Sequence, residues 1–457
     1  MCRDDAGCKG RGKMNTPIAD FVENYNNSDM LRLHMPGHKG KGPLGIEYAD
    51  ITEVNGADVL SEAKGIIGES EKNASSLFMS GATYYSTEGS SLCVKAMLAA
   101  ALSVSGKSRR IVAARNVHKS FVYGAALLDI DTEWIYPLQS EHLCSCTVDP
   151  DVLRHTLKEQ KEPLAAVYVT SPDYLGNMQD IKALAEVCRE FSVPLLVDNA
   201  HGAYTAFLEN SVHPIALGAA MCCDSAHKTL PVLTGGAYLH VSKNLPVRPE
   251  VIRNSMALFG STSPSYLILQ SLDLCNKYLA EEYRNLLSQC VKNTAALRQR
   301  LGRTGWETVG DEPLKITVDC AKSGANGNDT ADYLRSFGIE PEFSDSRYVV
   351  LMFTPSVPDK GFEKVSDVLL TMPRHKGHLA APEYTLAPSK KAMSMRNAIL
   401  CPQRTVPVAE SAGFVCGTPV ISCPPAVPIV ISGEIITDEA VGVLLDCGIT
   451  EISVVCN

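Results

Sequence analysis

The sequence lacks the features by which three classes of protein are recognised. No apolar run approaches the roughly 20 residues that a helix needs to cross a bilayer. No CxxC pair stands at zinc-site spacing from a second one, although the chain contains 16 cysteines. Basic residues are not in excess, because the formal net charge is −9. These absences argue against a membrane protein, a metal site and a nucleic-acid binder that relies on a basic face.

The beginning of the chain also lacks the apolar segment of a secretory signal, since it reads MCRDDAGCKGRGK. A cytoplasmic location is therefore the expectation, and with it reduced cysteines in structural roles. Met14 opens MNTPIADFVENY, which is typical of an ordered amphipathic segment. Residues 1–13 are accordingly interpreted as a disordered leader or as the product of an upstream start site.

Between about residues 80 and 245, apolar runs alternate with helical segments. Helices are predicted over 90–105 and 181–191, and a strand over 164–170, with further strands in VPLLVDNAH, AAMCCDSAH and GGAYLHV. Strands with few polar residues indicate a mainly parallel sheet that is buried on both faces, the doubly wound α/β class. Functional residues are then expected at the carboxyl ends of the strands.

The rest of the chain has a different character. A long helical stretch over 265–302 precedes PLKITVD, DTADYLRSFG and RYVVLMF, which predict strand, helix and strand, and the last part is rich in proline and ends in the strand candidate EISVVCN. The predicted division is a leader and arm (1–50), a large domain (51–248), a small α/β domain (249–372) and a C-terminal subdomain (373–457).

Three polar elements could meet at the carboxyl edge of the predicted sheet. Asp198 and Lys228 each follow a strand, while Gly89, Ser90 and Ser91 open a strong helix whose free N–H groups suit a phosphate. Taken singly, these are a turn cap, a solvated lysine and an ordinary serine N-cap. Together, an amine, a carboxylate and a phosphate cradle are what pyridoxal 5'-phosphate (PLP) requires.

A histidine lies close to this group in the predicted topology. His118, in ARNVHKSF, follows another strand, where an imidazole could stack on the face of a cofactor ring. The alternative is a hydrogen-bonded histidine of a loop or of the core.

Seven strings extend this pattern from about Thr16 to the C-terminus: LRLHMPGHKGKG, TEGSS, RNVHKS, VDNAHGAY, DSAHKTL, GSTSPSY and CPPAVPIVISGE. In this order they resemble the fold-type I, PLP-dependent ornithine/lysine/arginine decarboxylases, in the short form without the N-terminal wing domain. The resemblance implies an aspartate-aminotransferase-like large domain, a smaller α/β domain and a C-terminal subdomain. It also implies a homodimer, or a larger even assembly, with active sites shared between subunits.

The resemblance implies a role for each matching residue. Lys228 would be the Schiff-base lysine, Asp198 the partner of the pyridine nitrogen and His118 the residue stacked over the ring; with His227, these would be the catalytic residues. Ser261 or Thr262 would reach the active site of a neighbouring subunit. The implied cofactor-binding set is Lys228, Asp198, His118, His201, Gly89, Ser90, Ser91, Ser225, His227, Ser261 and Thr262.

The sequence departs from the family pattern at several positions. Glu88 and Ser90 replace the Asn and Thr of NGTS, and Ala426 replaces the Gly of PPGIP near the substrate end of the pocket. Glu434, in the following SGE, could meet the cationic end of a substrate or could be a structural carboxylate.

The resulting hypothesis is decarboxylation of arginine, lysine or ornithine to the corresponding polyamine-type amine, with Lys228 or His227 returning a proton to Cα. Arginine is slightly preferred by analogy with short-form relatives. One rival is an aminotransferase, in which Arg347 would clamp the α-carboxylate. Another is a catalytically silent, regulatory protein on the same fold.

Overall fold

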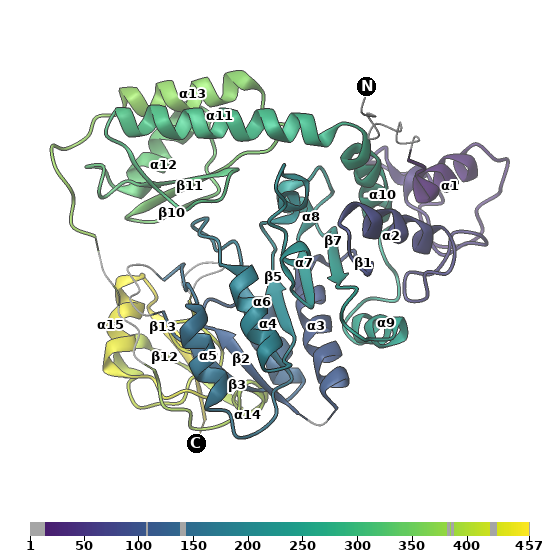
Figure 1. Cartoon of the computed structure of the whole chain (residues 1–457). Coiled ribbons are helices and arrows are strands. Elements are labelled where there is room, and N and C mark those ends of the chain that lie inside the picture. Colours follow the sequence, from purple (N-terminus) through teal and green to yellow (C-terminus); the bar gives the residue numbers. More distant parts are fainter. Residues whose placement is uncertain are drawn as a thin grey trace, which may run out of the picture.

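A seven-stranded sheet forms the centre of the chain, in the order β1-β7-β6-β5-β4-β2-β3 (Figure 1). The computed structural model describes residues 14–106, 108–137, 143–381, 384, 388–420 and 427–456. The strands are β1 (Ala82–Ser86), β2 (Arg110–Ala114), β3 (Asp131–Ile135), β4 (Ala166–Thr170), β5 (Leu195–Asp198), β6 (Met221–Asp224) and β7 (Ala237–Val241). Strand β7 runs opposite to the other six strands of this sheet, which all point the same way, so the prediction of a mainly parallel sheet is confirmed.

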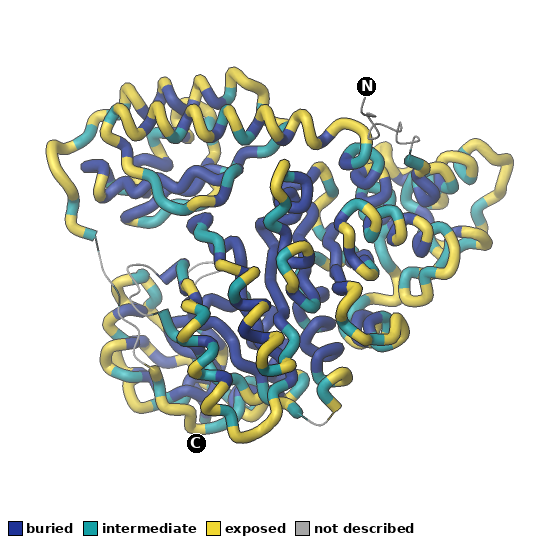
Figure 2. Tube along the Cα trace, viewed as in Figure 1, coloured by how far each residue is buried: buried dark blue, intermediate teal, exposed yellow. Residues whose placement is uncertain are grey.

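Helices cover both faces of this sheet. On β2, Ile111 and Ala113 pack into one core with α3 (Gly89–Ser105) and α4 (Lys119–Leu127). Their neighbours Val112 and Ala114 pack into a second core with α5 (Pro150–Lys158) and α6 (Ile181–Glu190). Successive side chains of a strand point to opposite faces, so a sheet that is covered twice needs continuous apolar runs. Figure 2 shows the sheet as the dark blue interior.

The remaining helices of this half surround the sheet. They are α1 (Pro17–Asn26), η1 (Glu47–Ala49), α2 (Ile66–Leu77), η2 (Ala203–Phe207), α7 (Pro214–Leu217), α8 (Ala226–Thr229), α9 (Pro249–Ala257) and α10 (Tyr266–Glu281). Helix α9 packs on α3, while α1, α2 and α10 pack together. The predicted helical stretch over 265–302 is two helices, because the chain turns at Glu282 between α10 and α11 (Tyr283–Arg303).

Helix α11 leads to a second, antiparallel sheet, in the order β10-β11-β9-β8 (Figure 1). Its strands are β8 (Glu307–Val309), β9 (Lys315–Asp319), β10 (Phe343–Ser344) and β11 (Tyr348–Met352), and α12 (Gly327–Ser336) and α13 (Asp359–Thr371) complete this unit. The predicted strand, helix and strand correspond to β9, α12 and β11, and are confirmed.

The C-terminal part lies beside β2 and β3 (Figure 1, yellow). It contains α14 (Met395–Leu400), β12 (Gln403–Pro407), η3 (Val408–Glu410), α15 (Asp438–Asp446) and β13 (Glu451–Val455). Strands β12 and β13 pair antiparallel, which confirms the strand predicted in EISVVCN, and α14 packs on α4. The division into domains stays a prediction.

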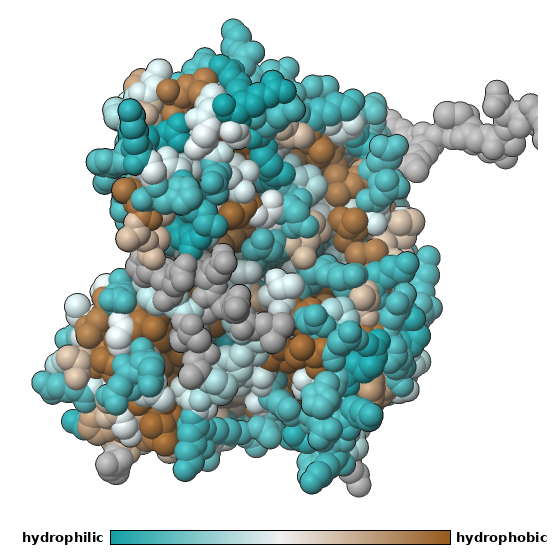
Figure 3. Space-filling model, turned by 60° about the vertical axis from the view of Figure 1, so that its left-hand side comes forward, coloured by the Kyte–Doolittle hydropathy of each residue, from teal (hydrophilic) through white to brown (hydrophobic). Residues whose placement is uncertain are grey.

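On the face drawn in Figure 3, hydrophobic residues occur in small groups between hydrophilic ones. None of the helices in the described ranges is long and apolar enough to span a bilayer. The cysteines of the described residues are free thiols, and most are buried.

Candidate active site

Lys228 and Asp198 lie on adjacent strand ends, as the sequence predicts. Asp198 is the last residue of β5, and Lys228 belongs to the short helix α8 that follows β6. The Asp198 carboxylate is buried and accepts a hydrogen bond from the Tyr168 hydroxyl at 3.2 Å. Burial lowers the pKa of Lys228, although the negative charge of Asp198 partly offsets this effect. A lysine with a lowered pKa is more often neutral, which is the nucleophilic form.

His201, which follows β5, holds the amine of Lys228. The Lys228 Nζ lies 3.1 Å from His201 Nε2. Burial and the charge of Lys228 keep the pKa of His201 well below its usual value, so the ring is neutral. The ring therefore accepts this bond at Nε2 and carries its proton on Nδ1, which has no partner among the described residues.

His118 lies in the same site. It caps the N-terminus of α4, where its Nδ1 accepts a hydrogen bond from the Ser120 backbone N–H at 3.2 Å. Burial lowers the pKa of His118, Asp198 raises it and Lys228 lowers it, with a net decrease. The structure thus brings His118, Asp198 and Lys228 together, and His118 is a neutral ring of fixed orientation. Their catalytic roles stay predictions.

The N-terminus of α3 faces the segment that carries Lys228. The Ser225 hydroxyl donates a hydrogen bond to the Ser90 hydroxyl at 2.7 Å. Gly89 has a φ of +71°, and a Cβ placed there would have no atom within 4 Å, so space is open beside the first turn. Ser91 lies half-buried in that turn. The Gly89 N–H donates to the Gly235 carbonyl oxygen at 2.7 Å, so the N–H groups of Ser90 and Ser91, the hydroxyls and the open space are what a phosphate group would use.

His227 belongs to the implied cofactor-binding set, but its protonation limits how it could bind a phosphate. Its Nδ1 lies 3.0 Å from the Gly236 carbonyl oxygen, so Nδ1 carries a proton. Burial lowers its pKa, although the bond to Gly236 opposes this. Neutral His227 thus offers only a lone pair at Nε2, and it donates a hydrogen bond to phosphate only when protonated.

Ser261 and Thr262 are exposed and lie beside the N-terminus of α3 in the same chain. The Ser261 backbone N–H donates a hydrogen bond to Glu88 Oε1 at 2.6 Å, and both residues line a small hollow with Glu88. Glu88, which replaces an Asn of the family pattern, therefore holds this loop. The role of Ser261 and Thr262 across a subunit boundary stays a prediction.

Two residues near Lys228 escaped the sequence analysis. The Tyr174 ring packs edge-on against His201, with ring centroids 5.6 Å apart, and its hydroxyl donates to Glu342 Oε1 at 3.2 Å. Glu342 is exposed, and its negative charge raises the pKa of Lys228. Tyr174 follows β4, so its place after a parallel strand was a usable signal. Glu342 directly precedes β10 of the second sheet, and no local pattern indicates that it approaches Lys228.

Glu434 and Arg347 are both engaged by the protein itself. Both oxygens of Glu434 bind the Arg115 guanidinium, at 2.7 Å each, and both residues are buried. Glu434 is therefore a structural carboxylate that ties the C-terminal part to the end of β2. Arg347 binds Asp319 through Nε at 3.1 Å and Nη2 at 2.9 Å, so this face of its guanidinium is occupied. Ala426 lies outside the described residues.

Two hollows of the surface differ in size and in the residues that line them. One hollow, of about 800 Å³, is lined by Glu71 and Arg253 and not by Lys228. A smaller one, of about 190 Å³, is lined by Lys228, His227 and Ser356. Asp198, His118 and Ser90 line neither hollow. We therefore place the site by the side chains around Lys228, where a nucleophile lies beside titratable groups of shifted pKa. Such a site can hold a cofactor that carries an aldehyde, a basic ring nitrogen and a phosphate.

Comparison with known proteins agrees with this geometry. Residues 16–312 match the family model described as "Orn/Lys/Arg decarboxylase, major domain". An arginine decarboxylase of Bacillus subtilis (strain 168) is 28% identical over 471 residues, which cover 95% of this chain and 94% of that protein. A lysine decarboxylase of Francisella novicida superposes with a TM-score of 0.80 at 15% identity and covers 96% of this chain and 81% of its own. The constitutive lysine decarboxylase of E. coli gives 0.78 at 16% identity, with 97% and 82% covered.

Proposed function

We propose, since the chain belongs to the Orn/Lys/Arg decarboxylase family, that it removes the α-carboxylate of a basic amino acid as CO₂ with PLP as its cofactor. The fold is that of the aspartate-aminotransferase-like enzymes. The observation that carries the proposal is the group of Lys228, Asp198 and His118, in which a lysine of lowered pKa faces a buried carboxylate and a neutral imidazole.

The residues present fit PLP. His201 Nδ1 and both polar atoms of the Asn116 side chain are buried without a partner in the described part of the chain. Buried polar atoms are normally hydrogen-bonded, so these are available to a polar ligand. Asp198 offers a carboxylate for a ring nitrogen, Lys228 an amine for an aldehyde, and the first turn of α3 a phosphate cradle.

The chain's own residues then divide the work. Bound PLP supplies an electron sink for the pair left by the departing carboxylate. Asp198, held by Tyr168, would keep a proton on the ring nitrogen, and the neutral His118 would help to hold the ring in place. Lys228 Nζ returns a proton to Cα, which replaces the carboxylate, and His201 orients that amine.

Glu342 supports a basic substrate, and by analogy with the relative from B. subtilis we propose arginine. Like Asp198, it raises the pKa of Lys228 through its negative charge, and it accepts a hydrogen bond from the neutral Tyr174 hydroxyl. An exposed carboxylate near the reacting amine favours a substrate with a distal cation.

The proposal is tested by supplying PLP and, in turn, arginine, lysine, ornithine and the neutral norleucine. One CO₂ per amine product is expected with at least one basic substrate and almost none with norleucine. Formation of 2-oxo acid in place of CO₂ would establish the aminotransferase. Bound PLP without any turnover would establish the silent protein.

Glu342→Gln is expected to raise KM for the preferred basic substrate roughly 10- to 100-fold, because a charge-assisted hydrogen bond contributes about 1.5–3 kcal/mol. The value of kcat should change less, since the distal cation is bound before and during the reaction. Steady-state kinetics measure both. The matched control is Glu340→Gln, an exposed glutamate two positions away that pairs with Arg335. Equal KM changes in the two variants would remove Glu342 from the substrate site.

We also propose that the chain forms a homodimer through the arm that follows α1. Five apolar side chains there are 61% to 82% exposed: Met30, Leu31, Leu33, Met35 and Leu44. An exposed apolar segment of this size usually marks an interaction surface. Sedimentation should give twice the chain mass, and a shift towards the chain mass when Leu31 and Leu33 are changed to Glu; a wild-type monomer contradicts the proposal.

A further inference from the structure

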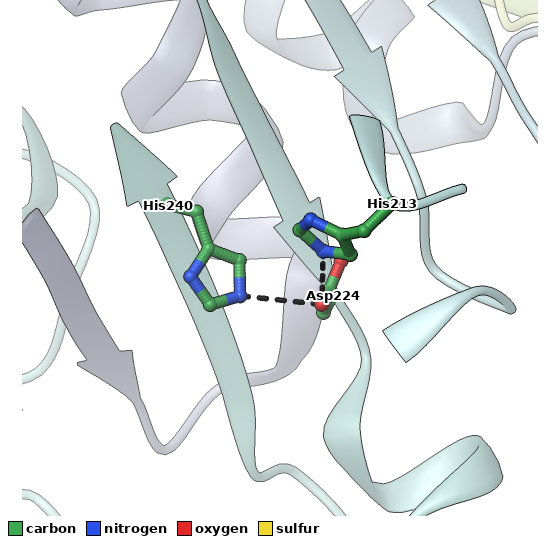
Figure 4. A group of neighbouring side chains, drawn as sticks. All are labelled: His213, Asp224 and His240. Carbon is green, nitrogen blue, oxygen red and sulfur yellow. Dashed lines mark hydrogen bonds and ion pairs between the residues drawn. The ribbon is translucent and has the colours of Figure 1, made fainter. Parts of the chain in front are cut away.

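One carboxylate and two histidines form a buried cluster next to the strand ends that lead to the candidate active site (Figure 4). Asp224 ends β6, His240 lies on β7 and His213 precedes α7. Asp224 and His240 are 0% exposed, and His213 is 1% exposed. In Figure 4 the two rings come from different elements and both point toward Asp224. None of the three residues belongs to the site described above.

Three side-chain N–H groups hold the Asp224 carboxylate. His213 Nε2 and His240 Nε2 lie 3.0 and 3.2 Å from Oδ2, and Asn199 Nδ2 donates to Oδ1 at 2.7 Å. The other nitrogen of His240, Nδ1, lies 2.8 Å from the Thr83 hydroxyl. A carboxylate only accepts hydrogen bonds, so both histidines carry a proton on Nε2.

Asp224 holds a negative charge in the core. Burial raises the pKa of Asp224, but His213 and His240 outweigh this and bring it below the usual range, so the group is ionised. Burial lowers the pKa of His240, although Asp224 opposes the shift, so that ring is neutral. A buried ion carries a desolvation penalty, which makes the cluster an unusual way to fill a core.

Hydrogen bonding explains the cluster better than a metal ion does. The three ligand atoms lie within 4.8 Å of one another, but the residues are closed to water, which would have to complete the coordination. Nδ1 of His213 has no partner among the described residues. A metal-bound histidine, by contrast, usually donates the N–H of its second ring nitrogen to another group. Cys222, 3.9 Å from His213, stays a thiol because burial raises its pKa well above the usual value.

The Asp224 carboxylate connects the two strand ends that carry the active site. Asn199 directly follows Asp198, and Ser225 directly follows Asp224 and leads to Lys228. One carboxylate thus binds the β5 end through Asn199 and is covalently continuous with the segment of Lys228. Both histidines fix the carboxylate from the other side, so it cannot turn toward Asn199 or away from it without losing a bond.

We propose that Asp224, held by its three N–H donors, is a positioning residue that sets the separation of Asp198 and Lys228. The inference rests on the function proposed above, because that function gives the separation its meaning. Asp224 does not touch the reacting atoms, and it acts through Asn199 and through the backbone of residues 225–228.

The first test is Asp224→Asn, which replaces one carboxylate oxygen by an N–H₂ group. Whichever way the amide turns, this group faces either the Asn199 N–H₂ group or the two histidine N–H groups, which are donors as well. The Kd of PLP for the apoprotein should rise at least tenfold, and kcat should fall more than KM rises. The matched control is Asp319→Asn, an equally buried carboxylate on the second sheet that binds Arg347. It should lower the Tm similarly and leave the Kd of PLP within twofold of wild type.

A second pair of variants separates positioning from packing. His240→Gln keeps an N–H donor near Asp224 and should retain most of the PLP affinity, whereas His240→Leu should lose it as Asp224→Asn does. Unchanged Kd and kcat in Asp224→Asn would overturn the inference. So would one equivalent of a transition metal per wild-type chain that is absent from His240→Leu. The two failures are distinguishable. Wild-type protein that binds no PLP would overturn the proposed function, whereas wild-type protein that binds PLP, together with an unaffected Asp224→Asn variant, would overturn only the role of Asp224.

Discussion

Replacing Lys228 by alanine is expected to abolish the visible absorbance of lysine-bound PLP and to lower kcat by roughly 10³- to 10⁴-fold. Two contributions disappear together: the covalent anchor for the cofactor and the amine that returns a proton to Cα. Proton transfer by a positioned side chain alone contributes about 10²- to 10⁴-fold. Absorbance spectra of the reconstituted protein and CO₂ release under saturating substrate measure the two effects.

Two variants control for charge and for general effects of removing a lysine. Lys228→Arg keeps a cation at this position but offers no neutral amine, so it should lose the absorbance band as alanine does. Lys119→Ala removes an exposed lysine next to His118 and should leave both readouts close to wild type. If the band persisted unchanged in Lys228→Ala, the cofactor would be bound by another residue.

The strand ends of the site were predictable because they follow from local pattern and topology together. An apolar run that ends in Asp198 and a second one that ends before Ser225 predict two parallel strands, and parallel strands place their carboxyl ends at one edge. The start of α3 was equally clear, since Gly89 and Ser90 open a long apolar helix. Local signals of this kind survive folding because tertiary packing reinforces them.

Residues that meet across large sequence separations were not predictable from the linear string. Glu434 pairs with Arg115, which lies 319 positions earlier, and the SGE string alone left a substrate contact and a structural carboxylate equally open. Glu342 approaches Lys228 only because the second sheet is placed over the first. Pairings of this kind depend on how the two sheets are arranged, about which residue spacing carries no information.

The turn at Glu282 shows the same limit within one helical segment. The string LAEEYRN contains neither Pro nor Gly, so no residue signals an end of the helix. The turn lets Leu279 and Tyr283 both reach the core while α11 runs on to the second sheet. Tertiary packing, which propensity does not include, therefore decides where α10 ends.

The arrangement of Arg347 bears on the choice between the rival enzymes. An aminotransferase keeps the α-carboxylate and benefits from an arginine that grips it, whereas a decarboxylase must let it leave. Here Asp319 occupies Nε and Nη2 of Arg347, and the guanidinium also lies 4.9 Å from the centre of the Tyr348 ring. An arginine held in this way supports a structural role, which favours the decarboxylase.

Asp198→Asn is expected to lower kcat by roughly 10²- to 10³-fold, the usual effect of removing one preorganised electrostatic group. An amide does not hold a proton on the ring nitrogen, so the cofactor loses its power to accept electrons. PLP should still bind, because Lys228 and the cradle at α3 are intact. Binding with slow decarboxylation therefore separates this variant from Lys228→Ala, which loses the covalent link.

A second effect is expected for Asp198→Asn, namely a shift in the pH dependence of PLP capture that a general loss of function would not produce. The negative charge of Asp198 raises the pKa of Lys228, so its removal should lower that pKa further. Lys228 then loses its proton at a lower pH, and the rate at which the apoprotein captures PLP should reach its plateau at a lower pH than in wild type. Asp198→Glu keeps the charge and serves as the control. An unshifted profile in Asp198→Asn would mean that the two side chains do not share one site, and the proposed chemistry would lose its basis.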